Sequence, residues 1–229
     1  MNKGLSTFAP LAWKTIVVHT VTYFFTGIVC YVVFDYPAKF SDPTYAGALR
    51  PLNHPLVMAG PIFQPIRGLL FAVVFYLLRD AFFSRRSGWQ TMWNVLLILG
   101  ILSPFGPAPC SIEGMIYTPF PFWAHITGLP ETVVQSLLLA YVLHYWVNHP
   151  NTKWLTTVLH VGFAIVIVFC GIGLLVKMKY AERLPNHPAA GNARSAFLLA
   201  IAREWPGVPE PGCWAKAPSR ILDTLKHYG

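Results

Sequence analysis

The sequence predicts an all-α fold, a polytopic membrane helix bundle of about five transmembrane helices with an interfacial or re-entrant segment between helices 3 and 4. Of its 229 residues, 55% are hydrophobic and only 11% are charged, with a mean hydropathy of +0.49. Soluble domains carry about 25% charged residues, so too few charges remain here to solvate a globule of this size. Five segments also hold about 20 mostly apolar residues each, which is the length that crosses a bilayer.

The five predicted helices cover residues 12–35, 60–83, 89–109, 130–148 and 154–177. The first apolar run is too long for the core of a signal peptide, and no A-x-A cleavage site follows it, so we expect it to be retained. The second begins with the prolyl entry GPIFQP. Tryptophans stand near helix ends, as interfacial aromatic belts do; they are Trp13, Trp89, Trp146 and Trp154.

Composition divides the chain into a predicted helix bundle over residues 1–179 and a proline-rich tail over residues 180–229. The tail includes two short amphipathic stretches, ARSAFLLAIAREW and PSRILDTLKHYG. Both are too short to span a bilayer, so we expect them to lie on its surface or on a partner.

Basic residues favour a cytoplasmic N-terminus. With five crossings, the loop over residues 79–88 lies on the N-terminal side, and it carries Arg79, Arg85 and Arg86. The segment over residues 110–129 lies on the other side and has no Lys or Arg. Short cytoplasmic loops carry an excess of basic residues, so we expect the loop over residues 79–88 and the N-terminus on the cytoplasmic side. Lys177, Lys179 and Arg183, just past the fifth helix, argue against it.

The candidate site centres on GPAPCSIEGMIYTPFPFW, residues 106–123. Its prolines break helix geometry, and irregular backbone at membrane depth survives only where protein or a wet cavity satisfies it. We therefore expect this stretch to line a cavity, with residues 115–128 as its roof. An ionisable residue at such depth is a functional candidate, and the predicted partner of Glu113 is Arg67, with Arg50 second.

Glu113 and Arg67 are the predicted catalytic pair, and the predicted substrate-binding residues are Arg50, His54, Gln64 and Tyr117. The other interpretations of Glu113 are a structural ion pair with Arg67 or a side chain that snorkels to the interface. Glu131 follows Pro130, so we expect it to begin the fourth helix, where its charge favours the helix dipole.

Three histidines, His19, His144 and His160, are predicted at similar depth on the N-terminal side. Histidines that face each other across a bundle can ligate a b-type haem or a metal. The HxxxH spacing that would strengthen this interpretation is absent. We therefore expect that the three do not share one ligand sphere.

Three functions remain open. The leading hypothesis is a membrane protein that binds a lipid-like or amphiphilic substrate, as an enzyme or a carrier. The alternatives are a structural or accessory subunit of a larger membrane complex, and a b-haem or metal-binding protein. The expected partners are membrane lipids and, in the second case, other membrane subunits. The net charge of +8 lacks a dense basic stretch, so no nucleic-acid partner is expected. No motif identifies a cofactor.

Overall fold

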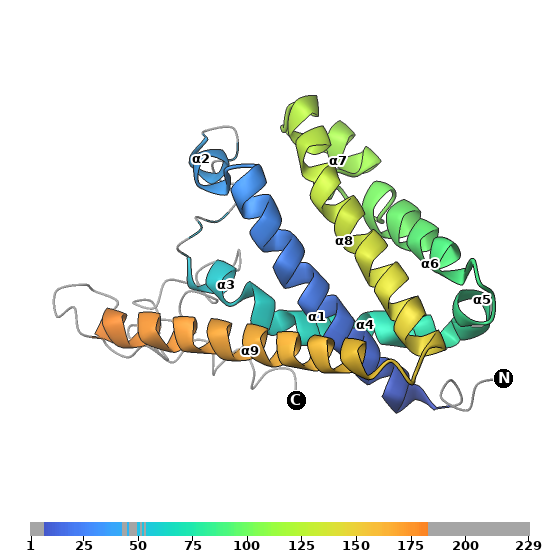
Figure 1. Cartoon of the computed structure of the whole chain (residues 1–229). Coiled ribbons are helices and arrows are strands. Elements are labelled where there is room, and N and C mark those ends of the chain that lie inside the picture. Colours follow the sequence, from blue (N-terminus) through green and yellow to red (C-terminus); the bar gives the residue numbers. More distant parts are fainter. Residues whose placement is uncertain (1–6, 43–44, 46–49, 51, 53, 183–229) are drawn as a thin grey trace, which may run out of the picture. The chain divides into compact units, whose positions relative to one another are not determined.

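A computed structural model describes residues 7–42, 45, 50, 52 and 54–182, and all regular structure within them is helical (Figure 1). This confirms the predicted all-α class. Among the described residues, four helices are long and apolar enough to cross a membrane: α1 (Phe8–Val33), α4 (Gly60–Leu77), α8 (Phe122–Asn148) and α9 (Lys153–Glu182), the last through its stretch to Val176. The predicted amphipathic stretches of the tail lie outside the described residues.

Four short helices connect these elements: α2 (Tyr36–Ser41), α3 (Pro55–Met58), α5 (Arg79–Phe83) and α7 (Ile112–Tyr117). The turn from α1 into α2 is made by Asp35, whose φ of 43° is left-handed. Its carboxylate accepts a hydrogen bond from the Ala38 N–H at 3.4 Å, which caps the new helix. Asp residues tolerate this backbone region better than most because their short polar side chains bond locally.

The third predicted helix is shorter than expected. It consists of α6 (Gly88–Leu97) and the π-helical turn η3 (Ile98–Leu102), a length below that of the four candidate spans. The Ser103 N–H donates to the Ile98 carbonyl at 2.8 Å, which closes the wide turn. Pro104 disfavours helical geometry at the preceding residue, so the helix ends here and not at residue 109.

The fourth predicted helix begins earlier than expected. α8 starts at Phe122, and Pro130 lies inside it. A proline inside a membrane helix is tolerated when neighbouring groups satisfy the freed carbonyl. Residues 115–128 therefore do not form one separate roofing segment: the first part belongs to α7 and the last part to α8. Glu131 lies within α8 and not at its start, so the predicted dipole role is wrong.

The chain divides into two compact units, residues 1–174 and 175–229, and the packing described here belongs to the first. α1 packs along α4 and α8, and α6 packs along α8 (Figure 1). At the α1–α4 contact a Cβ on Gly68 would lie 2.8 Å from the Ile16 Cα, so only glycine permits this approach. The core between the helices is apolar and includes Val17, Phe75 and Leu143.

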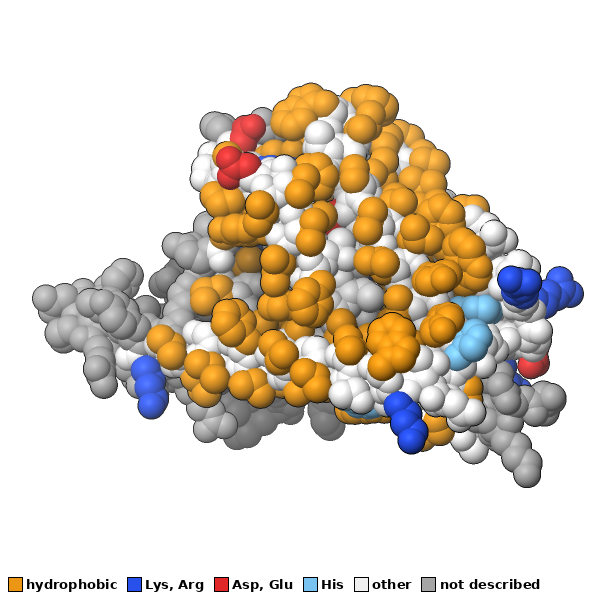
Figure 2. Space-filling model, in the orientation of Figure 1, with side chains coloured by type: hydrophobic (Ala, Val, Ile, Leu, Met, Phe, Trp, Pro, Cys, Tyr) orange, Lys and Arg blue, Asp and Glu red, His pale blue; other side chains and the backbone are white. Residues whose placement is uncertain are grey.

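The outward faces of the long helices are also apolar. Val32, Leu77 and Phe169 are 74%, 73% and 70% exposed, and they are three of many such side chains. Figure 2 shows apolar side chains over most of the face formed by α1 and α8, with basic side chains toward the edges of the view. Contiguous apolar surface of this extent is typical of a protein that contacts lipid or other protein.

Candidate functional site

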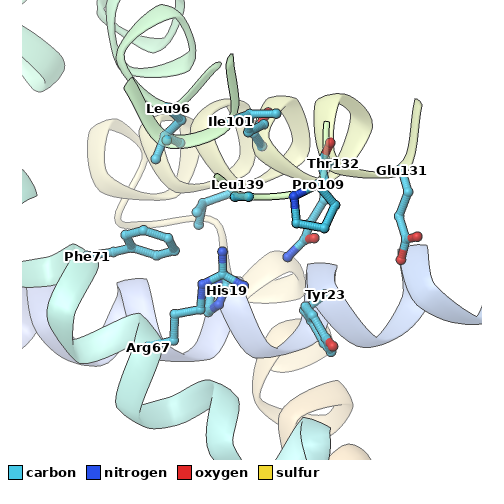
Figure 3. A pocket seen from close by; sticks show the side chains of 14 residues that line it. His19, Tyr23, Arg67, Phe71, Leu96, Ile101, Pro109, Glu131, Thr132 and Leu139 are labelled. Carbon is cyan, nitrogen blue, oxygen red and sulfur yellow. The ribbon is translucent and has the colours of Figure 1, made fainter. Parts of the chain in front are cut away.

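A cavity of about 350 Å³ lies among α1, α4, α8 and the stretch from Gly100 to Pro109 (Figure 3). Its volume falls at the lower end of the range of small-molecule sites. Its walls are apolar at Phe71, Leu96 and Leu139. Polar side chains from three helices also reach it: His19, Tyr23, Arg67, Glu131, Gln135 and Ser136. The cavity thus combines ionisable groups and hydrocarbon walls within helices that have the length of membrane spans.

His19, which lines the cavity together with Tyr23, belongs to a polar stripe in the otherwise apolar helix α1. Thr15, His19, Thr22 and Thr26 recur at intervals of four, three and four residues, which places them on one face, and all four are buried. The Thr15 and Thr22 hydroxyls each donate to a carbonyl four residues earlier at 2.8 Å. The stripe was not predicted, although the helical spacing of its polar residues is visible in the sequence.

His19 is fixed by a chain of hydrogen bonds between α1 and α4. The Gln64 amide nitrogen donates to the Gly60 carbonyl at 3.1 Å, so the Gln64 amide oxygen faces His19. The His19 Nε2 lies 3.1 Å from that oxygen and therefore donates to it. His19 is only 1% exposed, and its buried Nδ1 has no hydrogen-bond partner among the described residues.

Arg67 and Glu131 give the cavity two differently charged ends. The Arg67 guanidinium carbon lies 5.5 Å from the centre of the Phe71 ring, and Arg67 forms no hydrogen bond or ion pair with a residue that the structure describes. Glu131 accepts a hydrogen bond from the Tyr36 hydroxyl. In Figure 3 Arg67 and His19 lie toward one end, Glu131 toward the other, and Tyr23 between them.

The predicted pair of Arg67 and Glu113 does not form. Glu113 lies on α7, is exposed and does not line the cavity, and the same holds for Tyr117. Ser111 caps α7 by accepting a hydrogen bond from the Gly114 N–H at 2.9 Å. Glu113 therefore sits in the first turn of a capped helix, where a negative charge is favourable without a cationic partner.

The other predicted binding residues do not line the cavity. Gln64 is buried behind His19 and orients it. The His54 Nδ1 accepts a hydrogen bond from the Leu56 N–H at 3.2 Å, near the start of α3. Arg50 is exposed and, like His54, is not one of the residues that line the cavity. Of the predicted site residues, only Arg67 lines it.

A smaller apolar pocket of about 100 Å³ surrounds Cys110, whose φ of 71° is left-handed. The Cys110 N–H donates to the Nδ1 of His125 at 3.0 Å, which leaves the His125 Nε2 to donate toward the Thr118 hydroxyl at 3.4 Å. His125 is 1% exposed. The contact with His125 is made by the Cys110 backbone N–H and not by its thiol. These contacts hold the loop before α7 and provide no activated nucleophile.

The three histidines considered as haem or metal ligands have separate partners. His144 Nε2 lies 3.0 Å from the Arg85 carbonyl oxygen, and His160 accepts from the Trp13 indole N–H at 2.9 Å. His19 is bonded to Gln64. Within the described ranges, no group of three or more His, Cys, Asp or Glu side chains has an arrangement that would hold a metal ion.

The arrangement suits binding of a molecule that presents a polar or charged head to Arg67 and an apolar part to the walls. The comparisons with known proteins add no family to this description. No protein-family model, no curated protein and no solved structure matches the chain.

Proposed function

We propose that the protein is a multi-pass integral membrane protein that binds a lipid-like amphiphile in the cavity among α1, α4 and α8. The observation that carries this proposal is Arg67, a guanidinium in a candidate membrane span that lines a cavity and has no ion-pair partner among the described residues. On insertion scales an arginine at the centre of a membrane helix costs about 2.5–3.5 kcal/mol. An anionic ligand head would offset this cost.

The donor chemistry also favours an anionic head. Arg presents five N–H donors in a planar fork that matches carboxylate and phosphate oxygens. Contact with the Phe71 ring occupies one face of the guanidinium and leaves its N–H edges for a ligand. The apolar walls at Leu96, Ile101 and Leu139 would hold the hydrocarbon part of the same molecule. Binding is the step that an enzyme and a carrier share, so it is the property to test.

A fifth crossing is part of this proposal. Arg85 contacts His144 near the end of α8, and Cys110 contacts His125 near its start. These two α8 residues are 19 positions apart, or about 28 Å at 1.5 Å per residue, close to the hydrocarbon thickness of about 30 Å. Residues 85–110 would therefore return across the membrane as a short helix followed by irregular backbone. By the positive-inside rule, the Arg-rich loop at residues 79–88 then favours a cytoplasmic N-terminus.

The test compares the amphiphile retained by two arginine variants after purification in mild detergent. We expect mass spectrometry to find an anionic or zwitterionic amphiphile bound to the wild type. In Arg67→Gln we expect affinity for this ligand to fall by about 10- to 100-fold, the value of one or two hydrogen bonds to a charged group. Arg86→Gln, an exposed loop residue outside the cavity, is the control. Equal retention in all three proteins would contradict the proposal.

A further inference from the structure

We infer that the ligand head is zwitterionic: an anionic group faces Arg67 and a primary amine faces Glu131, as in an aminophospholipid. This inference rests on the proposed function, because it names the chemistry of the molecule that the same cavity binds. The observation behind it is that both charged groups line one continuous cavity and lie toward its opposite ends (Figure 3). A purely anionic head satisfies only one of them.

The Glu131 carboxylate has capacity for an amine. One of its oxygens, Oε2, accepts from the Tyr36 hydroxyl. An ionised carboxylate has about four lone-pair sites, so acceptor capacity remains after this hydrogen bond. No Lys or Arg forms an ion pair with Glu131 within the ranges that the structure describes, and Arg67 lies toward the other end. A ligand ammonium group would supply both the missing donors and the missing positive charge.

The short stretch of helix that lines the cavity limits the length of the ligand head. His19, at the Arg67 end, and Tyr23 lie one turn apart on α1, and Glu131 and Leu139 lie just over two turns apart on α8, which gives about 6–12 Å along the cavity. Hydrogen-bond contacts take about 3 Å at each end. About 0–6 Å then remains between the anion and the amine of the ligand, a range that includes a phosphate separated from an amine by a two-carbon linker and excludes a much longer head.

Neutral polar groups line the region between the two ends. Gln135 and Ser136 line the cavity from α8, one turn after Glu131. The Ser136 hydroxyl already donates to the Val133 carbonyl at 2.9 Å, so it offers acceptor lone pairs to the cavity. The Ser136 acceptor suits the hydrogens of an amine, while the Gln135 amide can either accept from the amine or donate to the anionic group. The apolar wall formed by Leu96 and Ile101 completes a site for an acyl chain.

The test titrates the full-length protein in detergent with three phospholipids of matched acyl chains and records bound lipid by native mass spectrometry. Phosphatidylethanolamine carries a phosphate and a primary amine, phosphatidylcholine has no N–H donor, and phosphatidylglycerol has no cation. We expect phosphatidylethanolamine to bind at least about ten-fold more tightly than the other two. Soluble phosphoethanolamine lacks acyl chains, so we expect it to leave the bound lipid in place.

Two variants separate the inference from the proposed function. Glu131→Gln keeps the shape and the acceptor for Tyr36, so we expect it to lower phosphatidylethanolamine affinity to the level of phosphatidylglycerol without weakening the latter. Arg67→Gln should weaken all three lipids. If the wild type binds phosphatidylglycerol as tightly as phosphatidylethanolamine while Arg67→Gln weakens both, the zwitterion inference is wrong and the proposed function stands. If no lipid depends on Arg67, both are wrong. Displacement by phosphoethanolamine would overturn the lipid assignment.

Discussion

His125 and Cys110 illustrate how single side chains hold irregular backbone in this protein. The loop between η3 and α7 contains three prolines, which lack N–H donors, so its remaining N–H groups depend on specific partners. The Cys110 N–H is buried and donates to His125 on α8. The φ of 71° at Cys110 is costly for a residue with a Cβ, so the surrounding contacts must stabilise this backbone conformation. The imidazole of His125 is one such contact.

We predict that His125→Ala destabilises the protein by about 1–3 kcal/mol, because it leaves the buried Cys110 N–H without an acceptor. His125→Asn should recover part of the loss, since its amide oxygen lies near the position of Nδ1. Thermal unfolding in detergent measures the change. The control is His149→Ala at the exposed end of α8, which we expect to change stability by less than about 0.5 kcal/mol. A melting temperature of His125→Ala equal to that of the control would show that this hydrogen bond is dispensable.

At the scale of helices, the contact between α1 and α4 positions the cavity. It places Arg67 and Phe71 of α4 beside His19 of α1, and the Gln64–His19 hydrogen bond fixes the relative rotation of the two helices. Gly68 lies immediately after Arg67 and permits the close approach to Ile16. The same glycine that brings the backbones together therefore determines how far Arg67 reaches into the cavity.

We predict that Gly68→Ala forces α1 and α4 apart and lowers stability by about 1–3 kcal/mol, which corresponds to a fall of about 2–12 °C in melting temperature. Because the displacement also moves Arg67, amphiphile retention should fall in the same variant. Gly27→Ala on α1 is the matched control, since a Cβ there meets nothing within 4 Å. A melting temperature for Gly68→Ala at or above that of Gly27→Ala would contradict the role given to the close approach.

At the scale of the whole molecule, membrane topology follows from how many times the chain crosses. In the part of the chain that the structure describes, four helices have the length and composition of spans, and α6 with η3 does not reach that length. Arg85 and Cys110 nevertheless contact His144 and His125, which lie near opposite ends of α8. If residues 85–110 cross the membrane as proposed, the loop at residues 79–88 and the segment around α7 would lie on opposite sides of it.

We predict that a cysteine at Ser84 and a cysteine at Tyr117, each in a background without native cysteines, label from opposite sides. Both positions are exposed. In intact cells an impermeant maleimide should label Tyr117→Cys and leave Ser84→Cys unlabelled until the membrane is broken. Labelling of Ser84→Cys alone would invert the orientation. Labelling of both or of neither in intact cells would rule out an odd number of crossings between them.

The sequence by itself determined that the protein is helical and where most of the long apolar helices lie. α1 and α9 begin and end within about five residues of their predicted bounds, because hydropathy, length and helix propensity are local properties. Arg67 was also identifiable, since a charge inside an apolar segment needs no tertiary information to be recognised.

Only the tertiary structure decided which groups meet. The sequence placed Glu113, Tyr117, Arg50 and His54 in the site by their shared depth, whereas the structure gives the cavity to His19, Tyr23 and Glu131. Depth along a membrane is readable from position in a segment, but the direction in which a side chain points depends on how each helix is rotated against its neighbours. Pro130 led to a second wrong prediction. The preference of proline for the start of a helix predicted that α8 begins at residue 130, whereas the structure accommodates this proline inside the helix.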